Sequence, residues 1–143
     1  MAFTTAQRAF LQAGALLFLL GLAQGAFIQA FANPRMALSA HLTAVQSGMA
    51  LMIAGIAWSA AALNAIPARI ARLSIVIGMY GLWIGLTMAA ATGASRGLPM
   101  AGAGHGAAAA TEALVSSLIL ASSALMTIGW ALFVIGLIRR ESA

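Results

Sequence analysis

The chain has 143 residues, of which 63% are hydrophobic and 6% are charged, and its mean hydropathy of +1.02 excludes a water-soluble surface of ordinary polarity. Seven arginines against two glutamates give a net charge of +5, which we attribute to the orientation of a membrane protein and not to a nucleic-acid partner. Because there is no cysteine, disulfides, thiolate metal ligands and cysteine nucleophiles are excluded.

Four apolar segments, each long enough to cross a bilayer as a helix, account for most of the chain. They cover residues 9–32, 38–63, 71–93 and 113–138. The pattern of a membrane barrel, with segments of about ten residues of alternating polarity, does not occur. We therefore predict an all-α fold, a polytopic four-transmembrane-helix bundle formed by a single domain over residues 1–143.

The connections between the spans carry the three prolines and decide the predicted orientation. Pro34, Pro67 and Pro99 lie between the spans, where a missing N–H group interrupts no helix. Five arginines fall on the side of the termini and two on the other: Arg8, Arg69, Arg72, Arg139 and Arg140 against Arg35 and Arg96. The positive-inside rule then predicts cytoplasmic termini and a multi-pass protein of the cell inner membrane.

The first span imitates a secretory signal peptide, with Arg8 before an apolar segment and an Ala-Phe-Ala tripeptide ending at Ala32. The apolar segment of about 24 residues exceeds a typical signal-peptide core of about 7 to 15 residues, so we predict that it is retained as a helix. Its amides, Gln24 and Gln29, need partners in hydrocarbon, and we expect bonds between helices to polar groups such as Ser47.

The second span, residues 38–63, contains His41. An ionisable side chain inside a membrane is costly and indicates a functional site, and neutral imidazole is a common metal ligand. On a helix, Ala44, Gly48 and Met52 share its face. Two interpretations are open: a close helix–helix contact of the small-xxx-small type, or a flat slot beside the imidazole for a planar macrocycle or aromatic ligand.

The third span carries Tyr80, Trp83 and Thr87 at three- and four-residue spacing. On a helix these side chains lie near one another and offer stacking and a hydroxyl group to an aromatic ligand.

The glycine-rich connection that follows the third span, TGASRGLPMAGAGHGAAAATE, is either solvated or folded back over the mouth of the bundle. We expect the ionisable groups of Arg35, His41, Arg96, His105 and Glu112 to gather at this non-cytoplasmic end. For His105 a solvated loop position remains open. Glu112 either complements the positive end of the fourth helix or serves as a partner of Arg96 or of a ligand.

Three segments resemble the hydroxylaminobenzene mutase family: ANPRMALSAHLTAVQSGMALMIAGIAW, YGLWIGLTMAAATGASRGLPMAGAG and the E-x-x-V-x-x-L-I run from Glu112. The resemblance covers most of the chain, and N-P-R-M…S-x-H-L is its most specific part. The architecture also resembles styrene oxide isomerase, whose second-helix histidine and arginine-glycine pair after the third helix can be laid on His41 and Arg96-Gly97.

The resemblance implies a four-helix membrane enzyme that rearranges a small apolar aromatic substrate without net redox change. Hydroxylaminobenzene mutases convert an aryl hydroxylamine to an ortho-aminophenol, whereas styrene oxide isomerase opens an aryl epoxide to an aldehyde. It also implies a homotrimer with haem b between protomers and His41 as the ligand to the haem iron. Ferric haem with an open sixth position would then act as a Lewis acid on the substrate oxygen.

On this hypothesis the candidate residues take three roles. The cofactor contacts are His41, Ala44, Gly48, Met52 and Arg96; the catalytic residues are Ser47, Tyr80 and Thr87; the substrate contacts are Trp83, His105 and Glu112. Ser47 and Leu82 stand where the relatives carry asparagine, so this chain departs from the family pattern at two positions. A serine hydroxyl binds a substrate heteroatom with shorter reach than an amide.

Two other classes of function remain open. A non-catalytic or electron-transfer haem protein would share His41 but would rearrange no aryl substrate. A small transporter would use Glu112 as a proton-coupled site, although the spans carry no acidic residue at their centres.

Overall fold

The computed structural model describes residues 2–141, with side chains as far as Arg139, and its long elements are all helices. In chain order they are α1 (Thr5–Gly25), η1 (Ile28–Ala30), α2 (Pro34–Ala57), η2 (Trp58–Ala60), α3 (Ala65–Thr92) and α4 (Ala109–Glu141). Each of the four α-helices is long and apolar enough to cross a membrane, and no strand occurs among the described residues. The predicted all-α, four-span membrane fold is therefore confirmed.

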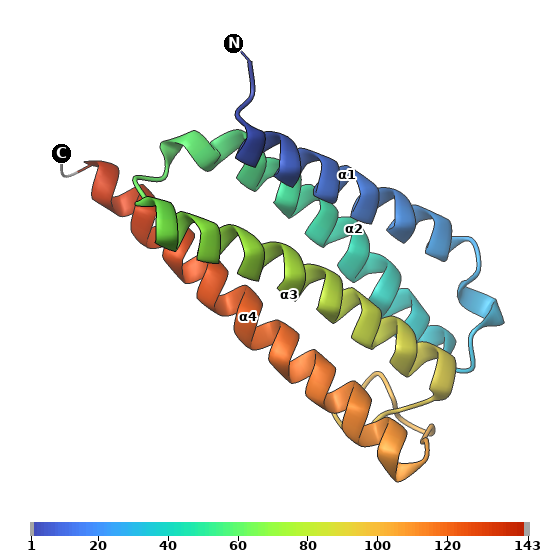
Figure 1. Cartoon of the computed structure of the whole chain (residues 1–143). Coiled ribbons are helices and arrows are strands. Elements are labelled where there is room, and N and C mark those ends of the chain that lie inside the picture. The colour runs from blue at the N-terminus through green and yellow to red at the C-terminus, as the bar shows by residue number, and fades with distance from the viewer. Residues whose placement is uncertain (1, 142–143) are drawn as a thin grey trace.

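The bundle consists of two tightly packed helical hairpins, α1 with α2 and α3 with α4, which join through α2 and α3 (Figure 1). Glycines permit the close approach within each hairpin. A Cβ atom on Gly48 of α2 would lie 2.6 Å from the backbone nitrogen of Phe18 in α1, and one on Gly78 of α3 would lie 2.6 Å from that of Met126 in α4. Small residues at these contacts let backbones pack closely where lipid removes the usual hydrophobic driving force.

Both termini and the α2–α3 connection lie at one end of the bundle, and the α3–α4 connection lies at the other (Figure 1). The end with the termini carries Arg8, Arg69, Arg72 and Arg139; the side chain of Arg140 lies outside the described residues. The arginines are therefore distributed as the positive-inside argument assumed, while the cytoplasmic location of the termini stays a prediction.

The helix boundaries differ from the predicted ones at both ends of the first connection. α1 ends at Gly25, well before the predicted end at residue 32. The prediction ran too far because residues 26–32 are mostly apolar, so hydropathy marks no boundary there. The prediction that all three prolines lie between helices is wrong for two of them: Pro34 opens α2, and Pro67 is the third residue of α3. The first turn of a helix tolerates proline because its N–H groups have no intrahelical partner.

Asn33, in the N-P-R-M segment, fastens the start of α2 to the rest of the bundle. Its side-chain oxygen accepts a hydrogen bond from the Met36 N–H at 3.1 Å, which caps α2, and its amide donates to the Ala101 carbonyl at 3.1 Å. Its own N–H donates to the Ala90 carbonyl at 2.9 Å. Through its side chain and its backbone N–H, this one buried residue joins α2, α3 and the last connection.

The connection between α3 and α4 folds back over the bundle and is not solvated throughout. Gly93 ends α3 with a φ of +78°, a left-handed conformation that glycine adopts without strain. Farther along, Leu98 and Ala101 pack against a buried cluster that includes Met36 and Leu86. Of the two alternatives that the sequence left open, the folded connection is the one observed.

Candidate functional site

His41 lies on α2, two turns from its start, and is half-buried against the end of α1. Its Nδ1 is 2.7 Å from the carbonyl oxygen of Gly21. Because a carbonyl oxygen can only accept, Nδ1 is the donor, and in the neutral imidazole Nε2 then keeps its lone pair. Histidines that bind metals are oriented by this same type of bond at the other ring nitrogen, so the geometry suits a ligand role for Nε2.

Gly25 of α1 creates the space for this imidazole, and Gly21 allows α2 to approach α1 closely beside it. A Cβ atom on Gly25 would lie 2.8 Å from Cε1 and 2.9 Å from Nδ1 of His41, and one on Gly21 would lie 2.8 Å from Cβ of Ala44. Sequence analysis missed both residues. The available signal was spacing, since Gly14, Gly21 and Gly25 share one face of α1.

The small residues of α2 beside His41 pack against α1. Ala44 is fully buried, Gly48 is buried under Phe18, and the side chain of Met52 lies against Gly14. The close helix–helix contact is therefore the correct interpretation of this stripe. An open slot for a planar ligand at Ala44 and Gly48 is wrong, because α1 occupies that space.

We expect Gly25→Ala to displace the imidazole, because the added methyl group would overlap the ring and break its bond to the Gly21 carbonyl. Imidazole ¹⁵N NMR should show the Nδ1–H tautomer of His41 in the parent protein and its loss in the variant. The cost in stability should be about 1 kcal/mol. Gly106→Ala is the matched control, since a Cβ atom there meets nothing within 4 Å; an unchanged His41 signal in Gly25→Ala would contradict the prediction.

Tyr80, Trp83 and Thr87 do lie on one face of α3, and they bind α1. The Tyr80 hydroxyl donates to the Ala13 carbonyl at 2.8 Å, and the Trp83 indole N–H donates to the Gln24 side-chain oxygen at 2.7 Å. The amide of Gln24 in turn donates to the Thr87 hydroxyl at 3.1 Å. Gln24 does bond between helices as predicted, but its partners are Trp83 and Thr87 of α3 and not Ser47 of α2. The polar groups of this seam hold α1 to α3.

Ser47 and Leu82, at the two positions of departure from the relatives, lie away from His41 within one chain. Six residues separate Ser47 from His41, which places the two side chains about 120° apart around α2. Ser47 is 7% exposed, and its hydroxyl makes no hydrogen bond within the part of the chain that the structure describes. Leu82 is half-buried and packs against an apolar cluster that includes Leu86 and Ala89.

Glu112, at the start of α4, is buried and holds the last connection in place. Its carboxylate accepts hydrogen bonds from three backbone N–H groups: Ser95 at 3.1 Å, Arg96 at 2.9 Å and Ala107 at 3.1 Å. The structure thus uses Glu112 to organise the loop, so its carboxylate is not free to serve as the proton-coupled site of the transporter alternative.

The other ionisable residues of this end do not combine into one site within a single chain. The side chains of Arg96 and His105 are exposed, and no ion pair joins them to Glu112 among the described residues. The five ionisable groups therefore lie at one end of the bundle, as expected. The expectation that they form a shared mouth of facing charges is wrong, because the Glu112 carboxylate turns toward backbone N–H donors.

The fold and the site together define a small polytopic membrane protein with a single oriented histidine. Within the described part of the chain, no three histidine, aspartate or glutamate side chains are grouped to hold a metal ion, so His41 offers one ligand only. A family model described as styrene oxide isomerase matches residues 6–138. The chain belongs to this family and is an intramolecular isomerase.

Two relatives from Ectopseudomonas oleovorans are similar over nearly the whole chain. Hydroxylaminobenzene mutase HabB is 37% identical over 131 residues, which cover 91% of this chain and 80% of the relative. Hydroxylaminobenzene mutase HabA is 32% identical over 127 residues, which cover 88% of this chain and 94% of the relative. No solved structure matches the chain.

Proposed function

We propose that this protein is a membrane-embedded mutase that rearranges an aryl hydroxylamine to an ortho-aminophenol, with His41 holding ferric haem b. The observation that carries the proposal is the orientation of His41. The Gly21 carbonyl binds Nδ1 at 2.7 Å and leaves the Nε2 lone pair for iron. The names of the two relatives support the reaction class.

When bound through a single protein ligand, ferric haem supplies an open coordination position that acts as a Lewis acid on the substrate oxygen. The contribution of the chain is to hold that ligand in one tautomer and to keep the surroundings dry. Apolar side chains such as Leu22, Leu38 and Leu42 surround this part of α1 and α2. They exclude water that would otherwise trap an electron-poor aryl group.

An aryl epoxide isomerase that yields an aldehyde is the second candidate, since the matching family model is described as styrene oxide isomerase. Both reactions are redox-neutral and act on a small apolar arene that reaches the protein from the lipid. Ser47 and Leu82 stand where the resemblance to both families implies asparagine, so these two positions favour neither candidate over the other.

A homotrimer with the cofactor at protomer boundaries belongs to the same proposal. His41 is half-buried, and no other described residue binds its ring beyond the contact with α1. Arg96 and His105 are exposed at the same end of the bundle, where a neighbouring protomer would bring them toward a shared site. Light scattering of the detergent-purified protein measures the number of chains.

The decisive experiment is an absorption spectrum of the detergent-purified protein, followed by product analysis with phenylhydroxylamine and with styrene oxide. We expect a Soret band and conversion of phenylhydroxylamine to 2-aminophenol. Phenylacetaldehyde as the main product would favour the second candidate. A colourless protein that takes up no added haemin would contradict the cofactor, and absence of both products would contradict both reactions.

Ser47→Ala should lower turnover by about tenfold while leaving the haem content unchanged. The motivation is a nearly buried hydroxyl without a hydrogen-bond partner among the described residues, at a position where the relatives carry asparagine. The loss of one hydrogen bond to substrate corresponds to about 1.4 kcal/mol. Ser39→Ala is the control, because that hydroxyl bonds within α2 to the Arg35 carbonyl. Normal turnover in Ser47→Ala would remove the role.

A further inference from the structure

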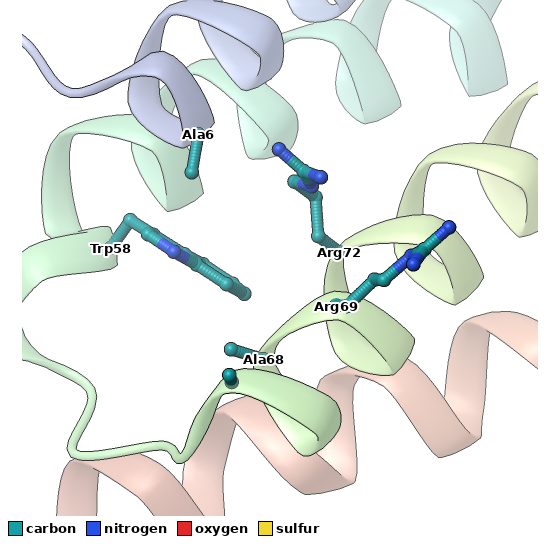
Figure 2. Close-up of a pocket in the computed structure, with 6 residues that line it drawn as sticks. Ala6, Trp58, Ala68, Arg69 and Arg72 are labelled. Atoms are coloured by element: carbon teal, nitrogen blue, oxygen red, sulfur yellow. The ribbon is translucent and has the colours of Figure 1, made fainter.

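A pocket of about 210 Å³ opens at the end of the bundle that carries the termini (Figure 2). It lies between the start of α1, η2 and the first turns of α3. The residues that line it are Ala6, Trp58, Ala65, Ala68, Arg69 and Arg72. Small alanines form its walls, and its polar side chains are one tryptophan and two arginines.

The polar groups of this pocket are hydrogen-bond donors without acceptors. Arg69 and Arg72 make no hydrogen bond or ion pair with the residues that the structure describes, and neither does the indole N–H of Trp58. The two arginines are three residues apart on α3, so they lie on neighbouring positions of one helix face. Glu112, the acidic side chain that the structure describes, lies at the opposite end of the bundle.

Two unpaired guanidinium groups and an indole N–H line the same pocket, and Figure 2 shows the two guanidinium ends pointing in different directions from α3. Rotated toward the pocket, these side chains form a donor set for a phosphate. A guanidinium presents planar paired donors that match phosphate oxygens, and tryptophan prefers the boundary between lipid and water. The position at the end of membrane-spanning helices is the depth at which phospholipid headgroups lie.

An apolar groove follows the same two helices toward the middle of the bundle. It has a volume of about 570 Å³ and is lined mainly by apolar side chains of the two helices, and also by two polar ones. The lining residues are Gln12, Ala13 and Leu16 of α1 and Val76, Ile77, Tyr80, Gly81 and Ile84 of α3. Val76 follows Arg72 by one helical turn, which places the groove about 6 Å farther along α3. The seam between α1 and α3 therefore offers a cationic pocket and then an apolar groove, in the order of a lipid headgroup and its acyl chain.

We propose that this seam binds one anionic phospholipid, with its phosphate among Trp58, Arg69 and Arg72 and an acyl chain in the groove between α1 and α3. An anionic lipid matches both features. A free phosphate would use the pocket alone, and an aromatic substrate would use the groove alone. A zwitterionic lipid would bring its own positive charge toward the two arginines.

The test measures lipid binding to the full-length, detergent-purified protein by native mass spectrometry. The probes are dioleoyl phosphatidylglycerol, dioleoyl phosphatidylcholine and glycerol phosphate. We expect one phosphatidylglycerol per chain, bound about tenfold more tightly than phosphatidylcholine, and weak binding of glycerol phosphate. The double variant Arg69→Gln/Arg72→Gln should lose the preference for the anionic lipid.

The matched control is Arg8→Gln/Arg139→Gln, which removes the same charge from the same end of the bundle but outside the pocket. It should keep the preference, and an equal loss in both double variants would overturn the proposal in favour of general surface charge. Ile77→Trp tests the groove at a side chain that is 55% exposed, and the substitution should weaken the binding of phosphatidylglycerol severalfold. Equal binding of the two lipids, or glycerol phosphate bound as tightly as phosphatidylglycerol, would also overturn the proposal.

Discussion

His41→Ala is expected to remove the Soret band and to lower turnover of phenylhydroxylamine by more than about 100-fold. The reason is that His41 is the one side chain whose free ring nitrogen is oriented by a bond at the other nitrogen, at 2.7 Å from the Gly21 carbonyl. Loss of a metal ligand costs at least as much affinity as loss of the group that orients it. Absorption spectroscopy and product analysis on the same preparation measure both effects.

His105→Ala is the matched control for this prediction. The imidazole of His105 is exposed in the last connection, and its ring makes only a long contact of 3.4 Å to the Ala103 carbonyl. The control should keep its haem, because the ring of His105 is not held by a short hydrogen bond as that of His41 is. Retention of haem in His41→Ala would show that another residue binds iron. Equal loss of haem from both histidine variants would show that the loss does not depend on the orientation of His41.

Glu112→Ala should destabilise the protein by about 3 kcal/mol and loosen the last connection. The substitution leaves the N–H groups of Ser95, Arg96 and Ala107 without their acceptor, and each unsatisfied donor costs about 1–3 kcal/mol when it stays buried. Thermal unfolding in detergent measures the loss of stability. Trypsin cleavage after Arg96, whose side chain is exposed, should become faster as the loop opens.

Two further variants separate the carboxylate from general effects of substitution. Glu112→Gln keeps one acceptor oxygen and should lose about half as much stability as Glu112→Ala. Ser116→Ala, one turn farther along α4, keeps the Glu112 hydrogen bonds and should show the cleavage rate of the parent protein. Parent-like cleavage and stability in Glu112→Ala would show that the carboxylate does not hold the loop.

The number and nature of the helices could be predicted because they depend on local properties. Each span needs only enough consecutive apolar residues to cross the bilayer, and hydropathy reports this directly. The helix boundaries were harder to predict. Pro34 and Pro67 lie inside first turns, where proline is tolerated, and residues 26–32 stay mostly apolar beyond the end of α1. Hydropathy carries no information about the backbone caps, such as Asn33, that begin a helix.

The candidate site was predicted unevenly, for a physical reason. An ionisable side chain in a lipid span stands out by its cost alone, which is why His41 was found. The glycine stripe of α2 allowed two interpretations, because a small residue gives a slot or a contact depending on what packs against it. Only the position of Phe18, over Gly48, decides for the contact. For Glu112, likewise, folding of the connection decides which donors the carboxylate meets.

The sequence by itself determined that this protein lies in a lipid bilayer, that it has four membrane spans with a single histidine inside one of them, and which family it resembles. All of these follow from composition, from runs of residues along the chain or from matched motifs. Only the tertiary structure decided which ring nitrogen of His41 is free, what fills the face beside it and where the N–H donors to Glu112 lie. These depend on the atoms that other helices bring within hydrogen-bond distance, and neither period nor hydropathy contains that information.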